Sequence, residues 1–151
     1  MASVRAVTAG SPQPDPVPEL RFKVVLQPEL PIGRFSECTG IAVEVETKEY
    51  MEGGSNDFVH KLPTRVKYPN IVLKRGVTHE DALLKWFFES RFTPVRHDMT
   101  ISLMGPGTAM VRSWVFMNAY PVKWTGPNLN ANSNSIASEQ LEIVHNGLRM
   151  V

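Results

Sequence analysis

Most of the chain alternates between hydrophobic and polar residues with a period of two, and one short stretch does not. The alternation is clearest in "GIAVEVETKEY" at residues 40–50, and it returns at 99–104 and 136–148. Such alternation places apolar side chains on one face of a strand, as in antiparallel sheets with one face in water. The pattern therefore predicts a mostly β protein, an antiparallel β-barrel or sandwich.

Two prolines mark irregular places in the extended segments. Pro63 and Pro69 lie in the extended segment at residues 58–75. Because proline donates no ladder hydrogen bond, this segment is expected to be bent or bulged. The remaining extended segments are 21–27, 58–75 and 109–124, and a loop follows at 125–135.

The exceptional stretch predicts one helix, at about residues 78–91. Thr78 is a good N-cap, and Glu80 and Asp81 would lie in the first turn, where the helix dipole favours anions. The apolar arc covers roughly 200° of the helical wheel, against ~100° for a single core contact. Its members are Leu83, Leu84, Trp86, Phe87 and Phe88. A helix that is apolar on two sides is expected to touch its own sheet and a neighbouring subunit.

The domain organisation is simple. Residues 1–20 end in "SPQPDPVPEL" and are predicted to form a proline-rich arm, with a disordered leader as the alternative. Residues 21–151 are long enough for one domain with its own core. Because the chain has no apolar run of membrane-spanning length and no signal peptide, we expect synthesis and assembly in the cytoplasm.

Charge and candidate chemistry exclude several classes of function. Lys and Arg number 16 against 15 Asp and Glu, which argues against a nucleic-acid arm. Cys38 is single, and the four histidines lack metal-ligand spacing. No nucleophile-elbow motif surrounds a serine, so no enzyme activity, metal or cofactor is predicted. The turn "LKRGVTHE" invites a phosphate site, but it lacks the phosphate-loop motifs and leads into two acids, which favours a structural turn.

An acidic segment is followed by a basic one. Residues 37–57 carry six acids and only Lys48 as a base, whereas residues 58–79 carry five bases and no acid. Paired as a hairpin, the two would be complementary across the strands and would offer a polar surface for docking on other copies.

These residues together resemble a known family. The resemblance is carried by "FSECTGIAVEVETKEYMEGGSNDFVHKLPTRVKYPNIVLKRGVTHEDALLKWF" and by "NAYPVKWTGPNLNANSNSIASEQLEIVHNGL". Both segments resemble the tail-tube (inner-tube) proteins of contractile phage tails and extracellular contractile injection systems. The resemblance covers roughly residues 22–148.

The resemblance implies a structural subunit with no catalytic site. In that family hexameric rings stack head to tail into a hollow tube, whose lumen is a continuous β-barrel and which sheath contraction drives through a target envelope. Implied partners are further copies of the chain, a sheath protein, baseplate and tube-terminating proteins, and a luminal cargo that is a protein effector or DNA. The particle is expected to be released by lysis.

Three groups of residues are assigned on this basis. The inter-ring stacking hairpin comprises Glu49, Glu52, Gly53, Gly54, Asn56, Lys61 and Arg65. The intersubunit helix contributes Leu83, Trp86, Phe87 and Phe88. The lumen-facing residues are Glu44, Glu46, Lys48, Ser138, Gln140 and Glu142.

Several alternatives stay open at the level of sequence. Phage tail and injection particle are not separated, nor are a main-tube subunit and a tube initiator. A second class of function is a small β-barrel that binds a ligand or single-stranded oligonucleotide, with Trp114, Phe116 and Tyr120 as a stacking surface.

Overall fold

The computed structural model describes residues 21–28, 30–51, 53–54, 59–107 and 109–151. The predicted arm at residues 1–20 lies outside this part of the chain. The described residues form ten strands and one helix. These are β1 (Arg21–Leu26), β2 (Leu30–Phe35), β3 (Glu37–Thr39), β4 (Glu44–Tyr50), β5 (His60–Lys67), β6 (Ile71–Gly76), α1 (Ala82–Glu89), β7 (His97–Met104), β8 (Met110–Thr125), β9 (Ser138–Val144) and β10 (Gly147–Met150).

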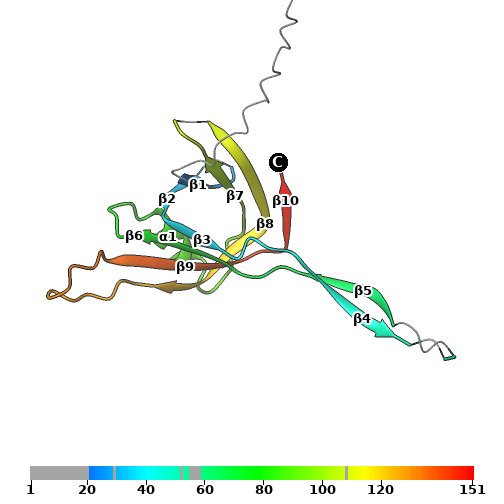
Figure 1. Cartoon of the computed structure of the whole chain (residues 1–151). Helices are drawn as coiled ribbons and strands as arrows, with labels where there is room; N and C mark the ends of the chain where they lie inside the picture. The colour runs from blue at the N-terminus through cyan, green and yellow to red at the C-terminus, as the bar shows by residue number, and fades with distance from the viewer. Residues whose placement is uncertain (1–20, 29, 52, 55–58, 108) are drawn as a thin grey trace, which may run out of the picture.

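The body is one strongly curved antiparallel sheet (Figure 1). Its strand order is β2-β1-β7-β8-β9-β6-β3, and β10 pairs with β8. The long strand β8 joins two parts of this sheet, because its first half pairs with β7 and β10 and its second half pairs with β9. The sheet curls until β2 contacts β6, which makes a small barrel. The predicted mostly β, antiparallel fold is confirmed.

The interior of the barrel is filled by the apolar faces of its strands. Val24 and Leu26 of β1, Phe116 of β8 and Leu141 and Ile143 of β9 are all fully buried. In β9 the predicted alternation is confirmed, since the residues between these apolar ones point out of the core.

The predicted segment 58–75 is two strands rather than one. β5 ends at Lys67 and β6 begins at Ile71, with Pro69 between them. The short strands β2 and β3 were not predicted, because Pro31, Gly33 and Ser36 interrupt their alternation.

The helix is shorter than predicted, and it begins later. Residues 78–81 form a turn in which the Glu80 N–H donates to the Thr78 hydroxyl at 3.3 Å. The Glu80 carbonyl accepts from Arg75 Nη2 at 3.0 Å, which holds it away from a helical position. Asp81 is therefore the N-cap, and neither predicted acid lies in the first turn of α1. No helix in the described part of the chain is long and apolar enough to cross a membrane.

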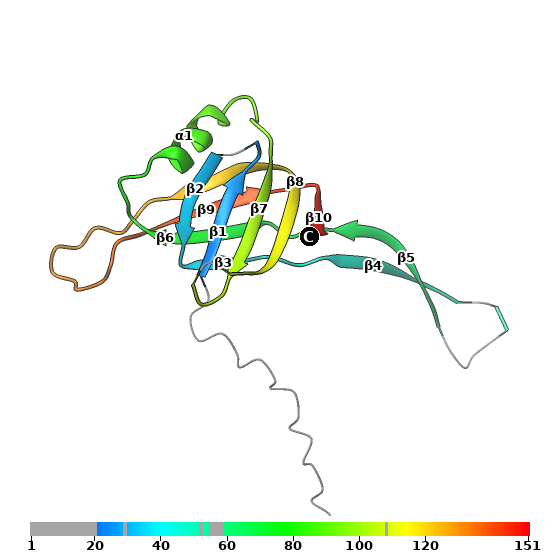
Figure 2. The same cartoon turned by 90° about the horizontal axis from the view of Figure 1, so that it is seen from above.

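Two segments project from the body in opposite directions (Figures 1 and 2). The β4–β5 hairpin extends from one end, and the loop at 126–137 between β8 and β9 extends from the other. The hairpin leaves the body at Gly40, whose φ is +91°. A Cβ at Gly40 would collide with the carbonyl of Asn70, where the chain returns, so only glycine fits this crossing.

Candidate functional site

The projecting hairpin is a two-stranded sheet that is separate from the barrel. β4 and β5 pair only with each other among the described strands, with Glu49 opposite Lys61 and Val45 opposite Val66. A register shift lies between Val45 and Thr47, as expected for a segment that contains Pro63. A two-stranded hairpin is marginal on its own, so its extended shape needs support from another surface.

Three charged side chains of the hairpin pair with one another. The Glu46 carboxylate forms ion pairs with both Arg65 and Lys67. Hydrogen bonds first from Arg65 and then from Lys67 hold the pKa of Glu46 below its ordinary value. The predicted pairing of an acidic with a basic strand is thereby confirmed, and Arg65 is occupied inside its own chain.

The apolar side chains of the hairpin are not covered by the chain. Val45 and Val66 are each about half exposed, and Leu62 and Tyr50 are also exposed. The alternation in β4 therefore marks a face that no other part of the described chain buries. Contiguous exposed apolar surface of this kind usually marks an interaction site.

The residues assigned to ring stacking fall on this hairpin as far as they are described. Glu49 and Lys61 face each other across the strands, and Gly53 and Gly54 form a turn near the tip. Glu52 and Asn56 lie outside the described residues.

The residues assigned to the lumen divide between two sheets. Glu44, Glu46 and Lys48 lie on β4, in the hairpin, whereas Ser138, Gln140 and Glu142 lie on the outer face of β9, in the barrel. One chain does not bring the two groups together. The outer face of β9 continues to the base of the hairpin, where Asn70 Nδ2 donates to Glu142 Oε1 at 2.7 Å.

The helix residues assigned to a subunit contact have two different environments. Leu83 and Trp86 are buried in the chain's own core, and Trp86 Nε1 donates to the Val95 carbonyl at 2.9 Å. Both are therefore intrachain core residues with no surface left for a neighbour. Phe87 is half-buried and Phe88 is 45% exposed, so the outward part of the predicted contact is restricted to these two.

An aromatic and cationic cluster continues from the exposed end of α1. The guanidinium of Arg91 lies 4.7 Å from the ring centre of Phe88 and 5.3 Å from that of Phe92. Phe92 itself is almost fully exposed. The cluster extends the apolar surface of Phe88 beyond the helix.

The turn considered for phosphate binding is structural. Arg75 is buried, and its Nε donates to Glu139 Oε1 at 2.6 Å. Its Nη1 donates to the Ile32 carbonyl at 2.9 Å, which ties β6 to β2 where the barrel closes. A side chain held in this way is not presented to a phosphate in solvent.

The surface considered for stacking nucleic-acid bases is not formed. Phe116 is fully buried, Trp114 is half-buried, and Arg96 covers the ring of half-buried Tyr120 at 4.8 Å. The residues that the structure describes also hold no group of three or more side chains suited to a metal ion.

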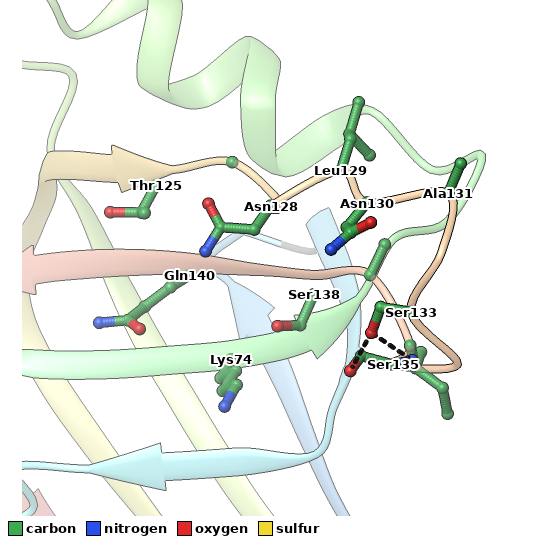
Figure 3. Close-up of a pocket in the computed structure, with 13 residues that line it drawn as sticks. Lys74, Thr125, Asn128, Leu129, Asn130, Ala131, Ser133, Ser135, Ser138 and Gln140 are labelled. Atoms are coloured by element: carbon green, nitrogen blue, oxygen red, sulfur yellow. Dashed lines mark hydrogen bonds between the residues drawn. The ribbon is translucent and has the colours of Figure 1, made fainter.

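Sequence patterns did not reveal a hollow at the end of the barrel opposite the hairpin. This end hollow has a volume of about 760 Å³ and lies between β6, β9 and the loop at 126–137 (Figure 3). Asn128, Asn130 and Gln140 supply amide groups, and Lys74 supplies its one charged side chain. The sign of the hollow in the sequence is the run of asparagine and serine residues in this loop. Such a composition predicts a loop but not its shape.

Comparison with known proteins identifies the family. Residues 18–149 match the family of the T4-like virus tail tube protein gp19. No curated protein matches this sequence.

Solved structures extend the comparison. A chain of the sheath–tube complex of an extracellular contractile injection system, PVC, in the extended state is 30% identical, with a TM-score of 0.78, over 91% of this chain and 93% of that one. A chain of the cap of the anti-feeding prophage (AFP tube terminating cap) is 30% identical, with a TM-score of 0.80, over 97% of this chain and 99% of that one. Hcp1 from Flavobacterium johnsoniae, at 17% identity and a TM-score of 0.53 over 86% of this chain and 94% of that one, shares the fold.

The family match spans nearly the whole described chain, and the 30% identical structures come from contractile assemblies. These matches are to structural components, and the small binding barrel is not favoured. The chain belongs to the T4-like tail tube family and is a structural tube protein of phage tails and contractile injection systems.

Proposed function

We propose that six copies of the chain close into a ring and that rings stack head to tail into a rigid hollow inner tube. The observation that carries this proposal is the β4–β5 hairpin, whose apolar side chains are left uncovered by its own chain. The related anti-feeding prophage baseplate is described as 6-fold symmetrised, which is consistent with a six-membered ring.

The hairpin provides the contact between rings. Its seven-residue strand β4 reaches about 23 Å at ~3.3 Å per residue, enough to extend well beyond its own barrel. Glu49, Lys61 and the turn at Gly53 and Gly54 lie in its outer part. Because exposed ion pairs such as those of Glu46 with Arg65 and Lys67 contribute little energy, the hairpin charges set register and partner choice more than affinity.

The outward part of α1 provides a contact within the ring. Phe88 faces away from the buried side of the helix, and Arg91 stacks on it. Phe87 packs partly against the core and leaves the rest of its side chain exposed. Burial of these side chains by a neighbouring subunit removes apolar surface from water, which is the main favourable term in such interfaces.

The polar strand faces line the channel. Ser138, Gln140 and Glu142 form the wet face of β9, and the hairpins of neighbouring subunits contribute Glu44, Glu46 and Lys48. A wall of alternating polar side chains offers little apolar surface to which a cargo can adhere.

The inner tube works with other parts of a contractile particle. A sheath contracts around it and drives it through a target envelope, a baseplate starts it and a terminating protein ends it. The related structures are described as a sheath–tube complex, a baseplate and a tube-terminating cap. The lumen carries a protein effector or DNA, and the particle assembles in the cytoplasm and leaves the cell by lysis.

Light scattering coupled to chromatography, followed by negative-stain microscopy, tests the proposal. The purified chain is expected to form rings or tubes, and Val45→Asp in the hairpin is expected to leave rings but shorten tubes. Val111→Asp, at a valine near the start of β8 that is exposed to nearly the same degree as Val45, is the matched control for an added carboxylate. A monomer that persists at high protein concentration contradicts the proposal.

A further inference from the structure

The hairpin needs a complementary surface, and the requirements on that surface follow from the geometry. Head-to-tail stacking is heterologous, so the surface that receives the hairpin differs from the hairpin and lies at the other end of the subunit. This inference rests on the proposed tube. It asks which residues of the next ring hold the hairpin.

The end hollow lies at the required place. The hairpin projects from one end of the barrel, and the loop at 126–137 that walls the hollow projects from the opposite end, in both views (Figures 1 and 2). A line of subunits that repeats in one direction along this axis therefore brings the hairpin of one copy to the hollow of the next.

The chemistry of the hollow suits the edge of a strand. Within the described residues, β4 and β5 pair only with each other, so each presents one edge of backbone N–H and C=O groups. Amide side chains both donate and accept hydrogen bonds, and they can satisfy either kind of backbone group. Figure 3 shows the amides of Asn128 and Asn130 directed toward the strand that carries Gln140.

The rim of the hollow supplies the apolar part. Leu129 is 85% exposed and Ile136 is 87% exposed, which places them among the most exposed large apolar side chains described. The hairpin exposes Val45, Val66 and Leu62. Contact between these two sets would cover apolar surface that each leaves in water.

The charge balance of the two surfaces is also compatible. Lys74 is the one charged side chain among the residues that line the hollow. Glu46 in the hairpin is neutralised by Arg65 and Lys67, whereas Glu49 lies further along β4 toward the tip. Lys74 therefore offers a partner for an acidic group of the hairpin, such as Glu49, when the two surfaces lose their water.

We propose that the loop side of the end hollow, with Asn128 and Asn130 on its wall and Leu129 and Ile136 on its rim, is the seat for the β4–β5 hairpin of a second copy in the adjacent ring, which leaves Ser138 and Gln140 of β9 on the channel wall. The hairpin adds its free edge to the amide-lined wall, and its apolar side chains rest on the rim.

Cross-linking in assembled tubes tests this seat. Cys38 is first replaced by Ala, although burial already raises the pKa of its thiol to about 11. Met51→Cys near the hairpin tip is combined with Leu129→Cys on the rim, and a bismaleimide of ~10 Å, the reach of three extended residues, tolerates small differences in register. The control combines Met51→Cys with Met110→Cys, which is also exposed but lies at the start of β8, outside the proposed contacts.

The pattern of products decides the outcome. We expect the Met51 and Leu129 pair to give a ladder that continues beyond six chains, and the control pair to give at least fivefold less product. A ladder that stops at six chains places the contact inside a ring, and tubes without a ladder place the hairpin elsewhere; either result overturns the proposed seat while the tube itself stands. A wild-type chain that forms no tubes instead overturns the proposed function.

A second variant covers the case in which the cysteine pair prevents assembly. Leu129→Asp combined with Ile136→Asp is expected to leave thermal unfolding of the subunit within 2 °C of wild type, because both side chains are almost wholly in solvent, and to reduce the mean tube length at least tenfold. Tubes of wild-type length from this variant contradict the seat.

Discussion

The buried ion pair that closes the barrel gives the sharpest prediction on stability. Arg75 is 2% exposed, and it donates to Glu139 and to two backbone carbonyls from β2 and from the turn before α1. Arg75→Met keeps the hydrophobic stem but leaves the Glu139 carboxylate buried without its cation. Removing one partner of a buried pair typically costs about 3–5 kcal/mol of unfolding free energy.

This free energy converts to a measurable shift. For a chain of 151 residues each 1 kcal/mol lowers the melting temperature by roughly 2–4 °C, so Arg75→Met is expected to melt about 6–20 °C below wild type. Circular dichroism or calorimetry at one protein concentration and one assembly state measures the shift. Lys74→Ala is the control, because Lys74 is the neighbouring residue in the chain but is half exposed, with its Nζ 4.0 Å from Glu37. The unfolding free energy of this variant should stay within ~0.5 kcal/mol of wild type.

A double variant separates the buried charge from the lost packing. Glu139→Gln removes the charge and keeps an oxygen that can accept from Trp124 Nε1, which lies 3.2 Å from Glu139 Oε2. Arg75→Met with Glu139→Gln should therefore regain part of the lost stability. A single Arg75→Met variant that loses less than about 1 kcal/mol would refute the assignment of a structural ion pair at the barrel closure.

Three further predictions concern the helix, the base of the hairpin and a buried histidine. Trp86→Ala should lower the unfolding free energy by about 3–5 kcal/mol, because Trp86 is 2% exposed. Phe88→Ala should change the unfolding free energy little but should weaken rings, as measured by light scattering. An equal loss of unfolding free energy in the two variants would contradict their different environments. Gly40→Ala should cost about 1–3 kcal/mol in thermal unfolding, since its φ is +91° and a Cβ meets the returning chain. Gly53→Ala, whose Cβ meets no atom within 4 Å, should be neutral, and an equal effect of the two changes argues against the crossing. Burial holds the pKa of His145 below its ordinary 6.5, so the unfolded chain takes up a proton that the folded chain does not, and stability should fall as the pH drops below about 6.5. His145→Gln should flatten that slope in pH-dependent unfolding, and an unchanged slope refutes the assignment.

The sequence predicted the fold where local pattern and tertiary environment agree. In β9 the alternation of Leu141 and Ile143 with polar residues matches burial, because one face meets the core and the other meets solvent. The same alternation in β4 predicted the strand but not what covers its apolar face. Val45 lies on an apolar face that no part of its own chain covers, and a single sequence does not state which molecule covers a face.

Other features depended on contacts between distant residues. The helix begins at Ala82 rather than Thr78 because Arg75 binds the Glu80 carbonyl, a tertiary contact that overrides good capping chemistry. In the sequence, Arg75 is one base of a basic segment, and nothing nearby in the chain predicts its burial. The burial depends on Glu139, which is distant in the chain and binds Arg75 in the structure. The end hollow likewise forms where the loop at 126–137 folds over two strands, and loop composition does not specify that shape.

A cryo-electron microscopy reconstruction of the assembled protein tests the central claim most directly. The account predicts a six-membered ring stacked into a hollow tube, with the β4–β5 hairpin of each subunit buried against the adjacent ring and the polar face of β9, with Ser138 and Gln140, on the channel wall. A reconstruction in which the hairpins extend freely into solvent, or in which the channel is lined by another face of the barrel, would contradict it.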